Sequence, residues 1–174
     1  MELALLDWIQ AHLRSGPLDV LMPALSRLAD HGDIWILLAA LLLFSPKRRR
    51  QGITVSCALV LDLLACNMVL KPLIGRGRPF LLRPDLILLV SPPGDASFPS
   101  GHTAASFAAA FALRAAGAEK RLWIPAMILA AGIAFSRLYL YVHWPSDVLG
   151  GILLGAVLGH LAGRLTARQR EGKF

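Results

Sequence analysis

Three short segments of the sequence hold side chains that together could transfer a phosphoryl group. They span residues 71–79, 98–103 and 136–147. Their candidate residues are two histidines, three cations, one carboxylate, one hydroxyl and one glycine: His102, His143, Lys71, Arg78, Arg137, Asp147, Ser100 and Gly101. Fixed cations and N–H donors stabilise the negative charge that phosphoryl transfer spreads over three oxygens. Two histidines can divide the attack on phosphorus and the protonation of the leaving oxygen.

The local sequence around each histidine favours this chemistry. Ser100 is a natural N-cap for the alanine-rich run that follows it, and free N–H groups at a helix start bind anions such as phosphate. His143 and Asp147 are four residues apart where Pro145 opens a helix, so their side chains share one face. A carboxylate in that position can hold the tautomer of the imidazole and stabilise its charged form.

The order of these residues resembles a known family signature. It consists of Lys, six residues and Arg-Pro, then Pro-Ser-Gly-His, then Ser-Arg, five residues, His, three residues and Asp. This pattern is similar in full to that of the type 2 phosphatidic acid phosphatases, a family that also includes class A bacterial acid phosphatases and vanadium haloperoxidases. The resemblance spans Lys71 to Asp147, with every motif position filled.

The resemblance implies a role for each candidate residue. His143 would attack phosphorus to form a phosphohistidine, Asp147 would orient it, and His102 would donate a proton to the leaving group. The phosphate oxygens would be cradled by Lys71, Arg78, Ser100, the Gly101 N–H and Arg137. The resemblance implies no metal ion and no cofactor.

Within the family, the chain resembles bacterial undecaprenyl pyrophosphate phosphatases in its small size and in the residues that flank the motifs. This implies hydrolysis of undecaprenyl pyrophosphate to undecaprenyl phosphate in cell-wall carrier recycling, at the outer face of the cytoplasmic membrane. Phosphatases of phosphatidylglycerol phosphate, phosphatidic acid or lipid A share the motifs and stay open as alternatives. A vanadium haloperoxidase and a non-catalytic lipid-binding membrane protein are more distant ones. The expected partners are a lipid phosphate or pyrophosphate and the membrane lipids.

The composition indicates a membrane protein. Of the 174 residues 56% are hydrophobic and 17% charged, against about 25% charged in soluble domains, and the mean hydropathy is +0.59. Helices that cross a bilayer need roughly 20 apolar residues each, so the chain has room for one membrane domain, residues 1–174, and little else. The net charge of +7 does not indicate nucleic-acid binding, because the cations form short clusters between apolar runs.

We therefore predict an all-α polytopic membrane bundle of five to six transmembrane helices that positions the three segments. The predicted elements are an interfacial amphipathic helix over 3–13, a bent or broken crossing over 18–44, crossings over 52–70, 101–117, 122–135 and 148–165, and a long loop over 71–98 between the second and third crossings. The glycines of the last crossing predict close packing against another helix.

The distribution of cations predicts the orientation, because cytoplasmic loops are enriched in Lys and Arg. Eleven of the eighteen fall on one side of these crossings: Lys47, Arg48, Arg49, Arg50, Arg114, Lys120, Arg121, Arg164, Arg168, Arg170 and Lys173. The opposite, external side receives Lys71, Arg76, Arg78, Arg83 and Arg137.

Several other polar residues receive weaker interpretations. Asp62 lies within a predicted crossing, and we expect it to make a structural hydrogen bond rather than to act in the reaction. Arg76 and Arg83 are expected to be solvated loop cations, with contact to a second phosphate as the alternative. The polar run 30–33 is expected to break a helix, with a place in the substrate entrance as the alternative.

Overall fold

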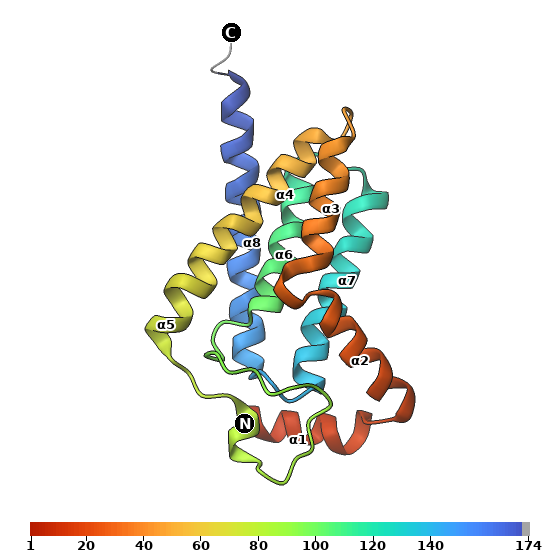
Figure 1. The fold of residues 1–174 in the computed structure, drawn as a ribbon, viewed down its shortest axis with the longest axis vertical. Helices are drawn as coiled ribbons and strands as arrows, with labels where there is room; N and C mark the ends of the chain where they lie inside the picture. Colours follow the sequence, from red (N-terminus) through yellow and green to blue (C-terminus); the bar gives the residue numbers. More distant parts are fainter. Residues whose placement is uncertain (172–174) are drawn as a thin grey trace.

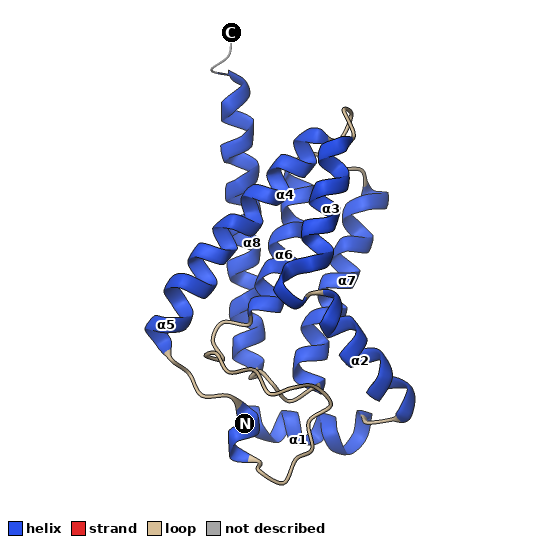
Figure 2. Ribbon diagram, viewed as in Figure 1, coloured by secondary structure: helices blue, strands red, loops and turns tan. Residues whose placement is uncertain are grey.

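The computed structural model describes the backbone of residues 1–171 and the side chains of residues 1–167. Within that range the chain is helical and contains no strand, as predicted (Figures 1 and 2). The elements are α1 (Glu2–Leu13), α2 (Gly16–Leu28), η1 (Asp30–Gly32), α3 (Asp33–Phe44), α4 (Arg49–Asp62), η2 (Leu63–Leu70), α5 (Lys71–Ile74), η3 (Pro79–Leu82), α6 (Gly101–Ala115), α7 (Lys120–Tyr139) and α8 (Pro145–Glu171).

Helix α6 is the centre of the bundle and contacts α4, α7 and α8 (Figure 1). Its side chains are buried on nearly every face, from Thr103 to Leu113. Most of them are alanines, so the neighbouring helices can approach closely. The N-terminus of this central helix carries Gly101 and His102, which fixes their position relative to the rest of the bundle.

Helices α6 and α8 contact each other backbone to backbone, and glycines make this possible. A Cβ atom added at Gly155 would lie 2.5 Å from the Ala104 carbonyl oxygen, and one at Gly151 would lie 2.8 Å from the Ser100 carbonyl oxygen. The predicted packing by small residues is confirmed. It brings the first turn of α8, which contains Asp147, against the first turn of α6.

The predicted break between residues 18 and 44 is present. Its residues His31 and Gly32 have positive φ values of 53° and 80°, in the left-handed region, so the helix cannot continue through them. The short 3₁₀ turn η1 at this break leaves Asp30 and His31 facing the interior cavity described below.

The second predicted crossing is longer than expected. Helix α4 passes into a π-helical stretch, η2, and then into α5, so helical backbone continues to Ile74. The long loop that we predicted follows it, although it begins at Gly75 rather than at Lys71. A π-helical turn inside an α-helix often marks a functional site, and this one leads directly to Lys71.

Three segments contain helix that is long and apolar enough to cross a membrane: Arg49–Leu82, Lys120–Tyr139 and Pro145–Ala167. The other predicted crossings contain shorter helices, with 12 residues in α3 and 15 in α6. The number of crossings, five to six, and the interfacial position of α1 therefore stay predictions. Large apolar side chains exposed on α3 and α8, such as Ile36, Leu41, Leu153 and Val157, give these helices outward faces suited to lipid.

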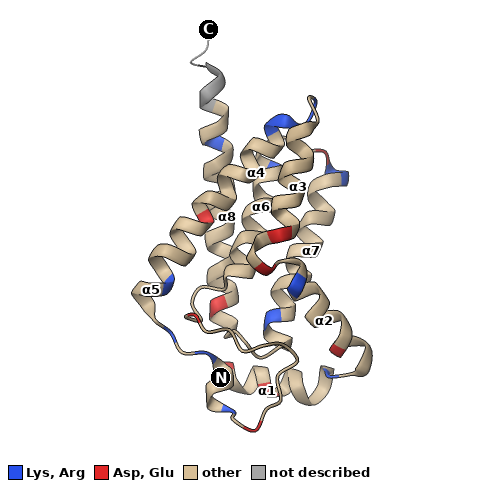
Figure 3. Cartoon of the chain, in the orientation of Figure 1, with Lys and Arg blue, Asp and Glu red and all other residues tan. Residues whose placement is uncertain are grey.

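The cations are segregated as the sequence indicated (Figure 3). The clusters in the α3–α4 and α6–α7 connections lie at the end of the bundle remote from α1, and the other end also carries Lys and Arg residues. Arg168, Arg170 and Lys173 lie outside the described side chains.

The glycine contact between α6 and α8 predicts a stability effect. Gly155→Ala places a Cβ against the Ala104 carbonyl oxygen, so the helices must separate, and we expect a loss of about 1–3 kcal/mol in the free energy of unfolding. Thermal unfolding of the purified protein in one detergent measures it. The control is Gly132→Ala in α7, where the new Cβ would meet Leu25 at an ordinary 3.6 Å. Equal stability of the two variants would contradict the contact.

Candidate active site

A cavity of about 720 Å³ opens beside the N-terminus of α6. Six of the eight predicted site residues line it: Lys71, Arg78, Gly101, His102, Arg137 and His143. The other two, Ser100 and Asp147, are fully buried next to residues of the lining. The structure thus brings together residues from α5, the long loop, α6, the end of α7 and the segment before α8.

His143 is held between a carboxylate and a guanidinium. Its Nδ1 lies 3.5 Å from Asp147 Oδ2, and its Nε2 lies 3.2 Å from Arg78 Nη1. Arginine only donates hydrogen bonds, so Nε2 must be the acceptor and the ring proton belongs on Nδ1, facing the carboxylate. Burial lowers the pKa of His143 and outweighs the opposing effect of Asp147. The lowered pKa favours the neutral ring. The result is a neutral imidazole with its nucleophilic lone pair on Nε2.

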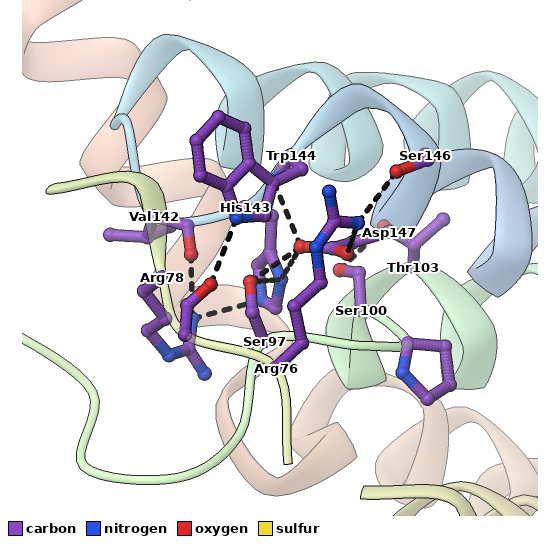
Figure 4. A network of polar contacts seen from close by, with 12 residues as sticks. Arg76, Arg78, Ser97, Ser100, Thr103, Val142, His143, Trp144, Ser146 and Asp147 are labelled. Atoms are coloured by element: carbon purple, nitrogen blue, oxygen red, sulfur yellow. Dashed lines mark hydrogen bonds and ion pairs between the residues drawn. The ribbon is translucent and has the colours of Figure 1, made fainter. Parts of the chain in front are cut away.

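Asp147 is surrounded by hydrogen-bond donors (Figure 4). Its Oδ2 accepts hydrogen bonds from the Ser97 hydroxyl and, at 2.9 Å, from the Trp144 backbone N–H. Its Oδ1 accepts one from Arg76 Nη1 at 2.6 Å. The carboxylate is therefore fixed in position, and it fixes the ring of His143 in turn.

Arg76 is not the solvated loop cation that we expected. Besides Asp147 it donates to the Ser146 hydroxyl at 2.6 Å and to Glu2 Oε2 at 2.7 Å, and its guanidinium lies over the Trp144 ring. The sequence could not indicate this, because Glu2 and Ser146 approach Arg76 only through the tertiary fold. Arg83 forms an ion pair with Asp7, and its side chain stays 47% exposed.

Two of the predicted phosphate-binding cations share one carboxylate, that of Asp95 in the long loop. Lys71 pairs with Asp95 Oδ2, and Arg78 Nη2 donates to Oδ1 at 2.6 Å. Partial burial alone would raise the pKa of Asp95, but the hydrogen bonds and charges of Lys71 and Arg78 outweigh it and lower the pKa to about 2. An anionic group thus occupies the position between two cations that a phosphate would take. Sequence reasoning missed Asp95.

His102 also has a carboxylate partner. Its Nε2 lies 2.8 Å from Asp30 Oδ1, which comes from the η1 turn and is 72 residues away in sequence. The polar run at 30–33 was a signal for this. It breaks the helix as expected, and Asp30, His31 and Gly32 line the cavity, while a place in the substrate entrance stays a prediction. The site therefore contains two histidine–carboxylate pairs that face one cavity.

Arg137 has a donor available for a ligand. It lies in the last turn of α7, is 3% exposed, and donates from Nη1 to the Ser26 hydroxyl. Its Nε is buried without a hydrogen-bond partner among the described residues. An unpaired buried donor is costly, and an oxyanion in the cavity would remove that cost.

Ser100 occupies the N-cap position of α6, as predicted, but its hydroxyl does not cap the backbone. It lies 2.9 Å from the Thr103 hydroxyl, while the Ser100 backbone N–H donates to the Asp147 carbonyl at 3.1 Å. Ser100 therefore links the starts of α6 and α8. Its predicted contact with phosphate stays a prediction.

Comparisons with known proteins show the family and the fold to which this chain is similar. Residues 51–171 match the sequence profile of the PAP2 superfamily. An undecaprenyl-diphosphatase of Sulfolobus acidocaldarius is 36% identical over 74% of this chain, which spans only 62%, less than two thirds, of that protein. A decaprenylphosphoryl-5-phosphoribose phosphatase of Mycobacterium tuberculosis is 35% identical over 84% of this chain and 82% of its own. The crystal structure of a transmembrane PAP2-type phosphatidylglycerolphosphate phosphatase from Bacillus subtilis superposes with a TM-score of 0.75 at 27% identity, covering 96% of this chain and 85% of that one.

The contacts of Arg76 predict a positioning role. Arg76→Gln removes the charged donor from Asp147 Oδ1, so we expect phosphate release to lose about tenfold or more in kcat, with a smaller change in KM. Arg83→Gln is the matched control, because that cation pairs with Asp7 instead. Steady-state kinetics on one phosphate-releasing substrate compare them, and equal effects of the two substitutions would argue against the role.

The contacts of Asp95 predict competition with phosphate. Asp95→Asn removes the negative charge between Lys71 and Arg78, so inorganic phosphate should inhibit the variant at an about tenfold lower concentration. Inhibition constants measured on the same substrate test this. Asp85→Asn, which changes an exposed carboxylate of the same loop, should leave the inhibition constant unchanged. A value for Asp95→Asn at or above that of the unmodified protein would be contrary to the expectation.

Proposed function

Because this chain belongs to the PAP2 superfamily, we propose that it hydrolyses a lipid phosphate or pyrophosphate through a phosphoryl group carried by His143. The observation that supports this most is that one cavity has cations and two histidines at one end and a mostly apolar lining beyond them. The first end suits a phosphate and the second suits a hydrocarbon tail.

The contacts of the site support a two-step reaction. His143 Nε2 attacks phosphorus, so that a P–N bond forms while the bond to the leaving oxygen breaks, and His102 gives its proton to that oxygen. Lys71, Arg78 and Arg137 stabilise the charge on the remaining phosphate oxygens. Water then attacks the phosphohistidine, His102 takes up a proton from it, and phosphate leaves with His143 restored. Asp95 must leave the two cations before the substrate phosphate can bind them.

A lipid substrate is favoured over a soluble ester by the far end of the cavity. Its lining there consists of apolar side chains from α3 and α4, among them Ile36, Ala39, Leu43, Leu59 and Val60. Burial of a hydrocarbon chain along them contributes roughly 25 cal/mol for each Å² of apolar surface removed from water. The phosphate end then lies at the level of the lipid headgroups. The segregation of cations supports our proposal that this end faces the external side of the membrane.

Undecaprenyl pyrophosphate is the first substrate that we propose, with undecaprenyl phosphate and inorganic phosphate as products. Support comes from the similarity to an undecaprenyl-diphosphatase. A polyprenylphosphoryl sugar phosphate is the second candidate. It is favoured by the longer match to the decaprenylphosphoryl-5-phosphoribose phosphatase and by a polar group inside the cavity, Asp62. Phosphatidylglycerol phosphate, phosphatidic acid and lipid A phosphates belong in the same substrate panel.

Substitution of the nucleophile tests the proposal. The purified protein in detergent should release phosphate from undecaprenyl pyrophosphate in the presence of a chelator, because the mechanism uses no metal ion. His143→Ala should abolish turnover and also the acid-labile phosphoryl adduct that forms when labelled substrate is quenched in base. His160→Ala, which changes an exposed histidine of α8, is the control and should retain both.

Two results would count against this function. One is a folded protein, verified by thermal unfolding, that releases no phosphate from any lipid of the panel in detergent or in liposomes. The other is a His143→Ala variant that keeps its turnover, which would require a different nucleophile.

A further inference from the structure

Asp62 does not make the structural hydrogen bond that we expected for it. Its side chain is 3% exposed, and Oδ1 is buried without a hydrogen-bond partner among the described residues. It lines the same cavity as the two histidines. A buried carboxyl group without a partner costs free energy, so a partner supplied by a ligand is the simplest reason for its position.

The helical stretch that carries Asp62 leads directly to the phosphate end. Asp62, Asn67 and Lys71 all line the cavity, and the π-helical stretch η2 joins them. Asn67 Oδ1 and Lys71 Nζ are neighbours at the start of α6, since each lies 3.5 Å from the position that a Cβ would take at Gly101. Asp62 is five residues before Asn67, roughly 7 Å further along the helix axis and away from the phosphate. At that distance from the phosphate, Asp62 would contact the chemical group that follows the terminal phosphate in a lipid substrate.

We infer that Asp62 and Asn67 form a head-group subsite that binds the hydroxyl groups of a sugar or polyol between the terminal phosphate and the lipid tail. This inference rests on the proposed function and narrows its substrate class. Carboxylate and amide oxygens accept hydrogen bonds, and sugar hydroxyls donate them.

A second phosphate is a poorer occupant of this subsite. The phosphates of a pyrophosphate present hydrogen-bond acceptors, so they cannot donate hydrogen bonds to the carboxyl oxygens of Asp62 or to the Asn67 amide oxygen as sugar hydroxyls can. The three Lys and Arg side chains in the described lining, Lys71, Arg78 and Arg137, belong to the terminal phosphate. The chemistry of the subsite therefore favours the second proposed candidate, a polyprenylphosphoryl sugar phosphate, or another lipid with a hydroxylated head group, over undecaprenyl pyrophosphate, the candidate that the sequence motifs favour.

Two substrate classes and three variants test the subsite. The full chain, its variants Asp62→Leu and Asp62→Asn, and the control Asp33→Asn are compared in one detergent on a prenylphosphoryl 5-phosphoribose and on a prenyl pyrophosphate. Asp33 is an exposed carboxylate near the cavity that is not part of its lining. We expect Asp62→Leu to lose about 10–100-fold in kcat/KM on the sugar phosphate and to stay within about twofold on the pyrophosphate. Asp62→Asn keeps a hydrogen-bond acceptor, so its kcat/KM on the sugar phosphate should fall by less than that of Asp62→Leu.

A substrate that lacks one hydroxyl gives a test that does not depend on any variant. The 2-deoxyribose analogue should be a poorer substrate of the unmodified protein, and Asp62→Leu should show no further preference between the two sugars. Equal losses of Asp62→Leu on both substrate classes, or equal turnover of the ribose and deoxyribose lipids by the unmodified protein, would overturn the subsite. Failure of the unmodified protein to cleave the sugar phosphate while it cleaves another lipid of the panel would also overturn the subsite. Failure to cleave any lipid of the panel would instead reject the proposed phosphatase function.

Discussion

The buried carboxylate of Asp147 needs hydrogen-bond donors on every side, because an unpaired charge inside a protein is strongly unfavourable. Donors reach it from the long loop, from the start of its own helix and from Arg76. Each donor segment is thereby held in place, and the ring of His143 is fixed among them. The close contact between α6 and α8 adds the second constraint, since it sets the two helix starts against each other without intervening side chains.

The cavity combines a charged environment at one end with an apolar environment at the other. At the start of α6 lie cations and the Arg137 Nε donor, which has no hydrogen-bond partner among the described residues. The lining along α3 and α4 is mostly apolar. A molecule must carry a phosphate at one end and a long apolar chain at the other to satisfy both. In the structure the carboxylate of Asp95 forms ion pairs with both Lys71 and Arg78.

The sequence alone predicted the residues whose types the chemistry dictates, and it predicted the helical class, the central break and the glycine packing. It did not predict Asp30, Asp95 or the contacts of Arg76, because each of these depends on a partner that lies far away in the chain. Asp62 was interpreted as structural because none of the motif positions gives it a role. Helix lengths were also misjudged where the π-helical stretch extends the second crossing to Ile74.

The link between Glu2 and the far end of the motif region has a consequence for biogenesis. Glu2 accepts hydrogen bonds from Arg76 and from the backbone N–H of Ser146, 144 residues later in the chain. During synthesis the first turn of α1 must therefore wait until almost every other helix has been inserted before it finds its partners. The candidate site, which includes His143 and Asp147, is completed at the same late stage, because these residues flank Ser146 in the chain.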